Sequence, residues 1–323
     1  MRVPNRSLVA AALCLFAFYP SASASSNRFI NAPTYPIYSN SFSIVSADFN
    51  GDHKVDLAVA DSNGSGTVDG LLGNGDGTFQ PFVTYPVGAS PSSIALGDFN
   101  GDGKIDIASA NTGGNSISIL LGNGDGTFQS AINYFGPPSS EPYMLAAGDL
   151  NGDGTVDLVA SNLPGPSILV FLGKGDGTFQ APVGYGSVFS PQFIALRDFN
   201  GDGKIDVALT NRSAVYILAG NGNGTFQTEV GSTAGSNPYA IVAADLNGDG
   251  FLDIATTNES GNSVTILLGK GDGTFRAPAT YPCGVMPYSL AVGDLNGDGK
   301  LDLLASDGGG TYPCSSEMVR AAS

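Results

Sequence analysis

A short acidic segment that occurs six times is the part of this chain best suited to chemistry. Its second copy runs from Asp98 to Asp106 and has oxygen-bearing side chains at positions 1, 3, 5 and 9. Calcium takes about six to eight hard oxygen ligands, and such a loop supplies them from side chains and from the backbone carbonyl of position 7. We therefore expect about six Ca²⁺ ions, one per loop. The predicted ligands are Asp48, Asn50, Asp52 and Asp56; Asp98, Asn100, Asp102 and Asp106; Asp149, Asn151, Asp153 and Asp157; Asp198, Asn200, Asp202 and Asp206; Asp245, Asn247, Asp249 and Asp253; and Asp294, Asn296, Asp298 and Asp302.

Two other interpretations of the acidic loop are weaker. An EF-hand needs glutamate at position 12, where the second copy has Ser109, and it needs helices on both flanks. A simple turn is also rich in Asp, Asn and Gly. However, three carboxylates within nine residues repel one another, and six repetitions of that arrangement favour a bound cation.

The first copy differs from the others at position 6, where His53 replaces glycine. We expect a positive φ there, which costs most residues about 1 kcal/mol. Histidine tolerates this conformation better than many side chains. The first loop is therefore predicted to hold a weaker calcium site than the others.

The net charge of -16 comes from these loops. Beyond residue 24 the chain has 29 acidic and 11 basic residues, and the six loops contain 18 of the acids. The remaining acids therefore balance the bases. An acidic protein of this kind is a poor partner for nucleic acid.

The spacing of the loops predicts the fold, because successive copies lie 47 to 51 residues apart. Between them a second string, of the type LLGNGDGTF, ends at Phe79, Phe128, Phe179, Phe226 and Phe275. Its Asn-Gly and Asp-Gly pairs are typical of hairpin turns, so we interpret it as a turn and not as a metal site. One unit is predicted to contain four strands, at Ser93–Gly97, Ile105–Ala110, Ser116–Leu121 and Phe128–Phe135.

Four short strands repeated about every 50 residues, without helical periodicity, indicate an all-β fold, a β-propeller of four-stranded antiparallel blades. Phe29–Ile37 matches the fourth-strand segment Phe79–Val87, so the chain starts within a blade. We expect this N-terminal strand to complete the last blade and close the ring. Counting the loops predicts six blades, with seven as the alternative. The last blade is degenerate or truncated after Asp307.

The N-terminus has the features of a secretory signal peptide. Arg2 and Arg6 precede an apolar run, and Ala22-Ser23-Ala24 fits the cleavage rule. We expect residues 1–24 to be removed and residues 25–323 to form one propeller domain, secreted and without a membrane span. Cys283 and Cys314 permit one disulfide bond, and their pairing is left open.

The DxNxDGxxD loops, the LGxGDGTF turn and the following F-x-A-P-x-x-Y strand, as in Phe179–Tyr185 and Phe275–Tyr281, resemble the FG-GAP or VCBS-like repeat family. The integrin α-chain propeller is its best-known member. The resemblance implies a propeller with Ca²⁺ in the loop that joins the first two strands of each blade, and a role in adhesion or extracellular recognition. The literal Phe-Gly and Gly-Ala-Pro pair of the family is absent.

Function is predicted from the two faces of the ring. Alternating strands place the acidic loops and NGDG turns on one face, so recognition of a protein or glycan ligand is expected on the opposite face. The variable loops there, and three tyrosines that each follow a proline, are the candidate contacts: Asp61–Gly70, Asn111–Asn115, Ser161–Pro166, Thr210–Ala214, Thr257–Asn262, Tyr143, Tyr239 and Tyr288. A packing role is an equal alternative for the three tyrosines.

An enzyme is not expected, because the chain has one histidine and neither a nucleophile elbow nor an HExxH motif. The predicted function is a secreted, monomeric, non-catalytic recognition or adhesion module. A carbohydrate-binding propeller is the main alternative, and a polysaccharide-active enzyme is a weaker one.

Overall fold

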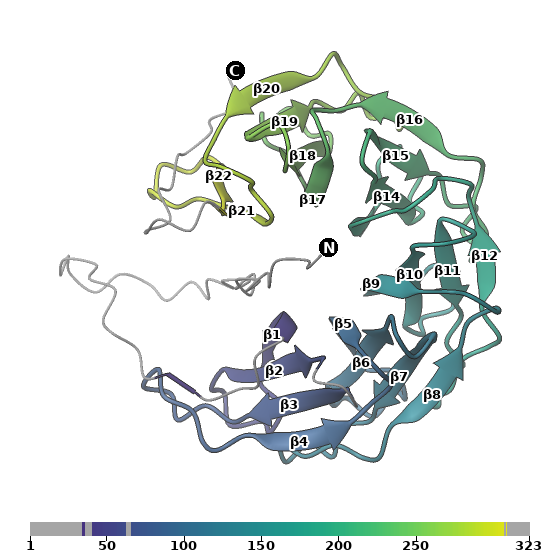
Figure 1. Ribbon diagram of the computed structural model, residues 1–323, viewed down its shortest axis with the longest axis vertical. Helices are drawn as coiled ribbons and strands as arrows, with labels where there is room; N and C mark the ends of the chain where they lie inside the picture. Colours follow the sequence, from purple (N-terminus) through teal and green to yellow (C-terminus); the bar gives the residue numbers. More distant parts are fainter. Residues whose placement is uncertain (1–33, 36–40, 63–65, 307, 309–323) are drawn as a thin grey trace, which may run out of the picture.

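The computed structural model describes residues 34–35, 41–62, 66–306 and 308. These residues form 22 β-strands in five four-stranded sheets and one two-stranded sheet, and every paired strand is antiparallel to its neighbour. No helix occurs among them, and accordingly none that could cross a membrane. Figure 1 shows the sheets around an arc, with the first strand of each sheet nearest the centre. The predicted all-β architecture of repeated four-stranded sheets is therefore confirmed.

The strands follow the chain as simple meanders, first strand innermost and fourth outermost. The first three sheets contain β1 (Ser41–Ala47), β2 (Asp56–Asp61), β3 (Thr67–Leu71) and β4 (Val83–Pro86); β5 (Pro91–Gly97), β6 (Asp106–Asn111), β7 (Ser116–Leu120) and β8 (Ile132–Phe135); and β9 (Pro142–Gly148), β10 (Asp157–Asn162), β11 (Ile168–Phe171) and β12 (Val183–Tyr185). The others contain β13 (Ile194–Arg197), β14 (Asp206–Thr210), β15 (Ala214–Leu218) and β16 (Val230–Thr233); β17 (Pro238–Ala244), β18 (Asp253–Asn258), β19 (Ser263–Leu267) and β20 (Ala279–Pro282); and β21 (Leu290–Gly293) and β22 (Asp302–Ala305).

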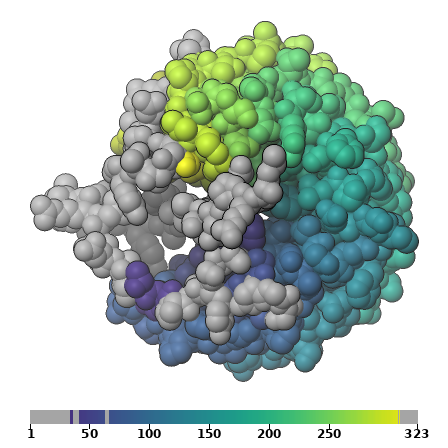
Figure 2. Space-filling model, viewed as in Figure 1, coloured from purple at the N-terminus to yellow at the C-terminus, as the bar shows by residue number. Residues whose placement is uncertain are grey.

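The hydrophobic core lies between neighbouring sheets. One cluster joins Phe99 and Ile117 of the second repeat to Leu158 and Phe179 of the third. Every residue of β6 is buried, whereas the outer strand β8 exposes three of its four residues. Strands buried on both faces carry nearly continuous apolar or small residues, as the second and third strands do here. Figure 2, from the same side as Figure 1, shows the sheets packed against one another in chain order.

Predicted boundaries were wrong in one strand and in several loops. The fourth strand of the second repeat begins at Ile132 and not at Phe128, which instead pairs with Gly122 in an isolated bridge that closes the turn. The predicted variable loops were also too long, because residues at their edges, such as Asp61, Asn111 and Asn258, end buried strands. These side chains are fully buried, so they are not surface contacts.

The last sheet contains only β21 and β22 among the described residues. Most of Phe29–Ile37, the segment predicted to complete it, lies outside them, but Tyr35 is described. Its hydroxyl accepts a hydrogen bond from the Phe79 backbone N–H at 2.7 Å. Tyr134 on the outer strand of the second sheet does the same for Phe179 of the third, at 3.3 Å. Tyr35 thus makes the contact expected of the outer strand of a preceding sheet, which supports closure; ring closure and blade number stay predictions.

The predicted signal peptide, residues 1–24, and Cys314 lie outside the described residues.

Candidate metal centre

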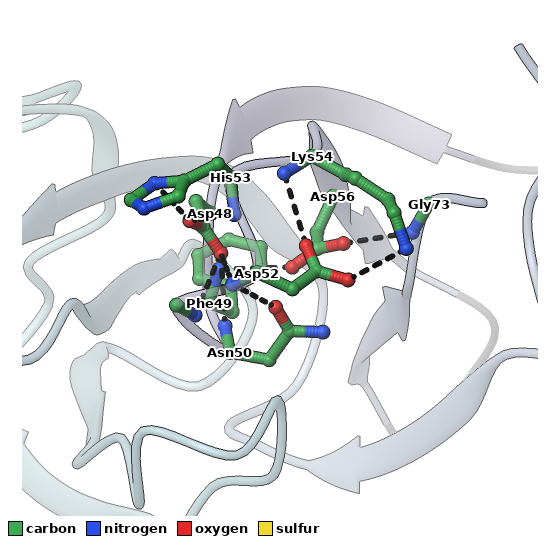
Figure 3. A network of polar contacts seen from close by, with 9 residues as sticks. Asp48, Phe49, Asn50, Asp52, His53, Lys54, Asp56 and Gly73 are labelled. Carbon is green, nitrogen blue, oxygen red and sulfur yellow. Dashed lines mark hydrogen bonds and ion pairs between the residues drawn. The ribbon is translucent and has the colours of Figure 1, made fainter. Parts of the chain in front are cut away.

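Each acidic loop curls around the carboxylate at position 1, as Figure 3 shows for the first loop. Asp48 Oδ1 accepts backbone N–H bonds from Gly51 at 2.7 Å and Asp52 at 3.2 Å, and Asp48 Oδ2 accepts one from His53 at 2.7 Å. The side-chain oxygen of Asn50 also accepts from Asp52 N–H, at 2.9 Å. Positive φ angles at Gly51 (75°) and His53 (61°) produce this curvature. The positive φ predicted for His53 is therefore confirmed.

The carboxylate at position 9 has a different environment, because it is fully buried. Asp56 Oδ2 accepts the Phe49 N–H at 2.9 Å, and Oδ1 accepts the Gly73 N–H at 2.7 Å. Phe49 belongs to the same loop, whereas Gly73 follows the third strand of the sheet. A Cβ on Gly73 would lie 2.1 Å from the Val55 carbonyl oxygen, so only glycine fits. The same pair of bonds is made by Asp106, Asp157, Asp206 and Asp253, while Asp302 makes the first of them.

Position 9 therefore fastens the loop to the end of the third strand, a role that sequence reasoning missed. Each oxygen of Asp56 accepts one hydrogen bond, and a carboxylate has about four lone-pair sites in all. The structural role leaves acceptor capacity for a cation. The glycine two residues after the third strand was the sequence signal for this bond, but it lies 17 residues from Asp56.

The pKa values of the loop carboxyls shift in opposite directions at positions 9 and 5. Burial raises the pKa of the Asp106 carboxyl, although the N–H groups of Gly122 and Phe99 oppose the shift. Burial likewise raises the pKa values of Asp157, Asp206 and Asp253. At position 5 the opposite holds, because the backbone N–H of Lys104 lowers the pKa of Asp102. The exposed part of the loop is thus its most acidic part.

Basic side chains accompany position 5 in several loops. The distance from the lysine Nζ atom to the aspartate Oδ2 atom is 3.1 Å for Lys54 and Asp52, 3.2 Å for Lys104 and Asp102, and 3.1 Å for Lys204 and Asp202. In the fifth loop Arg276 lies 3.5 Å from Asp249. These are exposed pairs, which typically contribute about 0–1 kcal/mol. They leave most of the negative charge of the loops without a strong counter-charge.

The NGDG turns lie beside the acidic loops, on the same face. The Gly126 N–H in the turn of the second sheet donates to the Phe49 carbonyl in the loop of the first, at 3.1 Å. Gly177 donates to Phe99 in the same way at 2.9 Å, and equivalent bonds link the next two pairs of sheets. The first four loops are therefore each tied to the following sheet through backbone atoms. The sequence of a single repeat could not predict this hydrogen bond, because its donor and acceptor belong to different repeats.

The opposite face carries the three candidate tyrosines. The hydroxyls of Tyr143 and Tyr239 lie 3.1 Å apart, although β9 and β17 belong to different sheets. The Tyr288 hydroxyl donates to Glu259 Oε1 at 3.0 Å, and the Tyr239 and Tyr288 rings meet edge to face. Burial raises the pKa of Tyr239 far above its usual range. The structure therefore brings these tyrosines together in one half-buried cluster.

The loops fit calcium in donor chemistry. Asp98, Asn100, Asp102 and Asp106 offer only oxygen atoms, the ligands that Ca²⁺ prefers. In the part of the chain that is described, no three Asp, Glu, His or Cys side chains converge on one point that could hold a metal ion. The position-1 carboxylates are instead turned towards backbone N–H groups.

Comparison with known proteins identifies the family. The profile of the FG-GAP-like repeat matches residues 48–109, 98–160, 198–256 and 245–305, which together make up more than half of the chain. The chain belongs to the FG-GAP-like repeat family. Each matched segment of this FG-GAP-like repeat protein starts at position 1 of an acidic loop and ends within the second strand of the next sheet. No protein of curated function is significantly similar to the chain.

Several solved structures share the fold at low sequence identity. A putative 6-phosphogluconolactonase from Bacteroides uniformis has a TM-score of 0.62 and 17% identity, over 82% of this chain and 77% of that one. A protein from Lactobacillus plantarum has a TM-score of 0.56 and 17% identity, over 83% and 81%. A lectin from Agrocybe aegerita that recognises non-reducing terminal N-acetylglucosamine has a TM-score of 0.51 and 22% identity, over 73% and 65%. At these identities the similarity shows the fold alone.

Proposed function

We propose that this FG-GAP-like repeat protein is a secreted calcium-binding propeller that acts as a non-catalytic recognition module outside the cell. The observation that carries the proposal is the acidic loop, repeated six times, in which the exposed carboxylates of positions 1 and 5 meet backbone N–H groups and few cations. In the second loop Asp98, Asn100, Asp102 and Asp106 would hold the ion. Bound Ca²⁺ would supply the positive charge that offsets the repulsion between these carboxylates.

Calcium in the loops would stabilise contacts between sheets. The carbonyl of Phe99, at position 2, accepts the Gly177 N–H from the next sheet, and its buried side chain packs against Phe179 there. A loop held by an ion keeps this residue in place. Loss of the ion is expected to loosen the whole series of sheets, because each one depends on its neighbour.

Recognition is assigned to the face opposite the loops. The connections between sheets on that face expose Phe135 (65% exposed), Phe189 (76%) and Val285 (50%). Exposed aromatic side chains such as Phe135 and Phe189 are enriched where proteins bind other molecules. The tyrosine cluster of Tyr143 and Tyr239 lies at the inner ends of the same connections. We assign a protein or glycan ligand to this face.

A non-catalytic role agrees with the positions of the polar groups. His53 is the one histidine of the chain, and its side chain is 97% exposed. The buried aspartates at position 9 are engaged by backbone N–H groups. The groups best placed for acid–base chemistry thus have structural partners.

Native mass spectrometry of the secreted chain, with Ca²⁺ added, tests the calcium proposal. Wild type is expected to bind about six ions, and Asp102→Asn, which removes one loop charge without changing the side-chain shape, is expected to lose one. Asp125→Asn is the matched control, since Asp125 is an equally exposed acid in the neighbouring turn and Asn223 makes the same bonds in the fourth sheet. Binding of no ion, or an equal loss in Asp125→Asn, would refute the proposal.

Carbohydrate binding is a second candidate, favoured by one observation. A cavity of about 230 Å³ opens between the fourth and fifth sheets, and it is lined by hydroxyl, amide, carboxylate and aliphatic groups together. The Agrocybe aegerita lectin shows that a propeller of related fold can recognise a sugar.

A further inference from the structure

Two fully buried aspartates lie on the first sheet outside its acidic loop. Asp61 ends β2, and Asp69 lies on the neighbouring strand β3 (Figure 1). Asp61 pairs with Thr67 in the antiparallel register, and Asp69 lies two residues further along β3. Paired residues, and residues two apart on one strand, share a face of the sheet, so these three side chains lie together. Val68 packs towards the second sheet, so the three side chains lie on the opposite face.

The same positions form a closed hydrogen-bond network in two other sheets. In the second sheet Asn111 stands in the place of Asp61, and its Nδ2 donates to Ser116 Oγ at 3.1 Å and to Ser118 Oγ at 2.8 Å. The fifth sheet repeats this arrangement, with bonds of 2.9 Å from Asn258 Nδ2 to Ser263 Oγ and to Thr265 Oγ1. One amide NH₂ group thus supplies the hydrogens for two hydroxyl oxygens.

In the first sheet acceptor oxygens replace this donor. An ionised carboxylate only accepts hydrogen bonds, so Asp61 cannot donate as Asn111 does. Thr84 donates to Asp69 Oδ1 at 2.8 Å. However, Asp69 Oδ2 and Thr67 Oγ1 are buried atoms without a hydrogen-bond partner among the described residues. The place of the amide group in the other sheets is therefore taken by oxygen atoms alone.

These oxygen atoms form a site for a positive ion. Burial raises the pKa of the Asp69 carboxyl, and the charge of Asp61 raises it further, although the Thr84 hydroxyl opposes the shift. Asp69 forms no salt bridge within the described part of the chain. Buried carboxylates are normally paired with a cationic group or bound to a metal ion, because an uncompensated buried charge is costly. Two carboxylates carry two negative charges, which a divalent ion balances.

We propose that Asp61, Thr67 and Asp69 bind a Ca²⁺ ion at a site separate from the six acidic loops. All three offer oxygen, the ligand type that Ca²⁺ prefers, and water is a usual source of its other ligands. β2 begins at Asp56, the last predicted ligand of the first loop, and ends at Asp61, so the two sites lie at opposite ends of one strand. The inference therefore does not depend on calcium in the loops.

Native mass spectrometry of the secreted chain, with Ca²⁺ added, tests the proposal by counting ions. The double variant Asp61→Asn/Asp69→Ser installs the amide and hydroxyl of the second sheet, so it should bind one ion fewer than wild type. Asp76→Asn is the matched control, because Asp76 is an exposed acid in the turn of the same sheet and Asn223 makes the same bonds in the fourth. This control should bind as many ions as wild type.

Thermal unfolding in chelator shows whether the double variant folds. Its Tm should be at least that of wild type, because its hydrogen-bond network closes without an ion. Added Ca²⁺ should then raise the Tm of wild type more than that of the double variant, since wild type has one more site to fill.

Three results would overturn the proposal. An equal number of ions in the double variant and wild type would favour protonation of the two acids instead. An equal loss in Asp76→Asn would assign the loss to charge in general, and a lower Tm of the double variant in chelator would contradict the network argument. The acidic loops are tested separately, because wild type should still bind one ion, absent from the double variant, even if the loops bind none.

Discussion

The ring of Tyr35 lies edge-on to the ring of Phe79, with centroids 5.6 Å apart and an angle of 84° between the planes. The Tyr35 hydroxyl accepts the Phe79 N–H at 2.7 Å. The same type of contact joins Tyr134 to Phe179 across two complete sheets. The N-terminal end of the described chain therefore occupies the place of an outer strand that precedes the first sheet, as closure of the ring requires.

Removal of this contact is predicted to weaken the first sheet. Tyr35→Ala should lower the free energy of unfolding by about 2 kcal/mol, because it removes an aromatic pair and a hydrogen-bond acceptor. Tyr35→Phe, which keeps the ring, should cost about 1 kcal/mol or less. Denaturant unfolding measures both. Equal stability of Tyr35→Ala and wild type would mean that the N-terminal segment does not complete a sheet.

Substitutions at positions 9 and 5 of the acidic loop are predicted to lower stability under different conditions. Asp106→Asn places an amide where the carboxylate accepts the Phe99 and Gly122 N–H bonds, so it should destabilise the protein by about 2–3 kcal/mol even in chelator. Asp102→Asn should cost stability mainly when calcium is present. Thermal unfolding of both variants in chelator separates the two roles. An undiminished stability of Asp106→Asn in chelator would rule out the structural role of position 9.

His53→Gly is predicted to improve the first loop. His53 has a φ of 61°, where glycine is favoured by about 1 kcal/mol, and Gly103 occupies the equivalent position in the second loop with a φ of 78°. The variant should raise stability by up to about that amount and strengthen calcium binding at the first site. Calcium titration of His53→Gly beside wild type checks this. An unchanged titration curve would show that His53 does not weaken the site.

A buried acid in the first sheet is predicted to make stability depend on pH. Asp69 is fully buried, its Oδ2 has no hydrogen-bond partner, and burial together with the charge of Asp61 raises its pKa. A raised folded-state pKa means that the protein gains stability below the unfolded value of about 3.9 and loses it as pH rises through the folded value. Asp69→Asn avoids that loss while its side-chain oxygen can still accept from Thr84, which donates to Asp69 at 2.8 Å.

Urea unfolding of Asp69→Asn and wild type at pH 4 and pH 7, in chelator, measures this effect. The variant should gain about 1 kcal/mol relative to wild type at pH 7, and less at pH 4. The loop acids are present in both proteins, so their titration cancels in the comparison. A gain that is independent of pH would mean that the charge of Asp69 is not the cause.

Much of the fold was predictable because each repeat carries its own local signals. The Asn-Gly and Asp-Gly turns, the acidic loops and the apolar runs between them located the strands of the second sheet to within about one to four residues. The start of the fourth strand was missed because Phe128, an apolar residue, serves to close the turn by pairing with Gly122. Residue type alone does not distinguish that bridge from a strand.

The candidate site was predictable only in its composition. The spacing of Asp98 and Asp102 identified a loop with the chemistry of a calcium site, but the bond from Gly122 to Asp106 joins residues 16 positions apart. The link from Gly126 to Phe49 crosses between sheets. Such relationships depend on how repeats pack, which no single repeat encodes.

Thermal unfolding of the secreted chain, in millimolar Ca²⁺ and in chelator, tests the central claim most directly. At a tenfold excess over a Kd of about 10⁻⁴ M, each occupied site adds about 1.4 kcal/mol, so several sites together should raise Tm by many degrees. Mg²⁺ at the same concentration, which demands a tighter octahedral geometry, should give a much smaller shift. A large shift specific to Ca²⁺ is the predicted result. An identical Tm in Ca²⁺ and in chelator would contradict the account, and the acidic loops would then be turns alone.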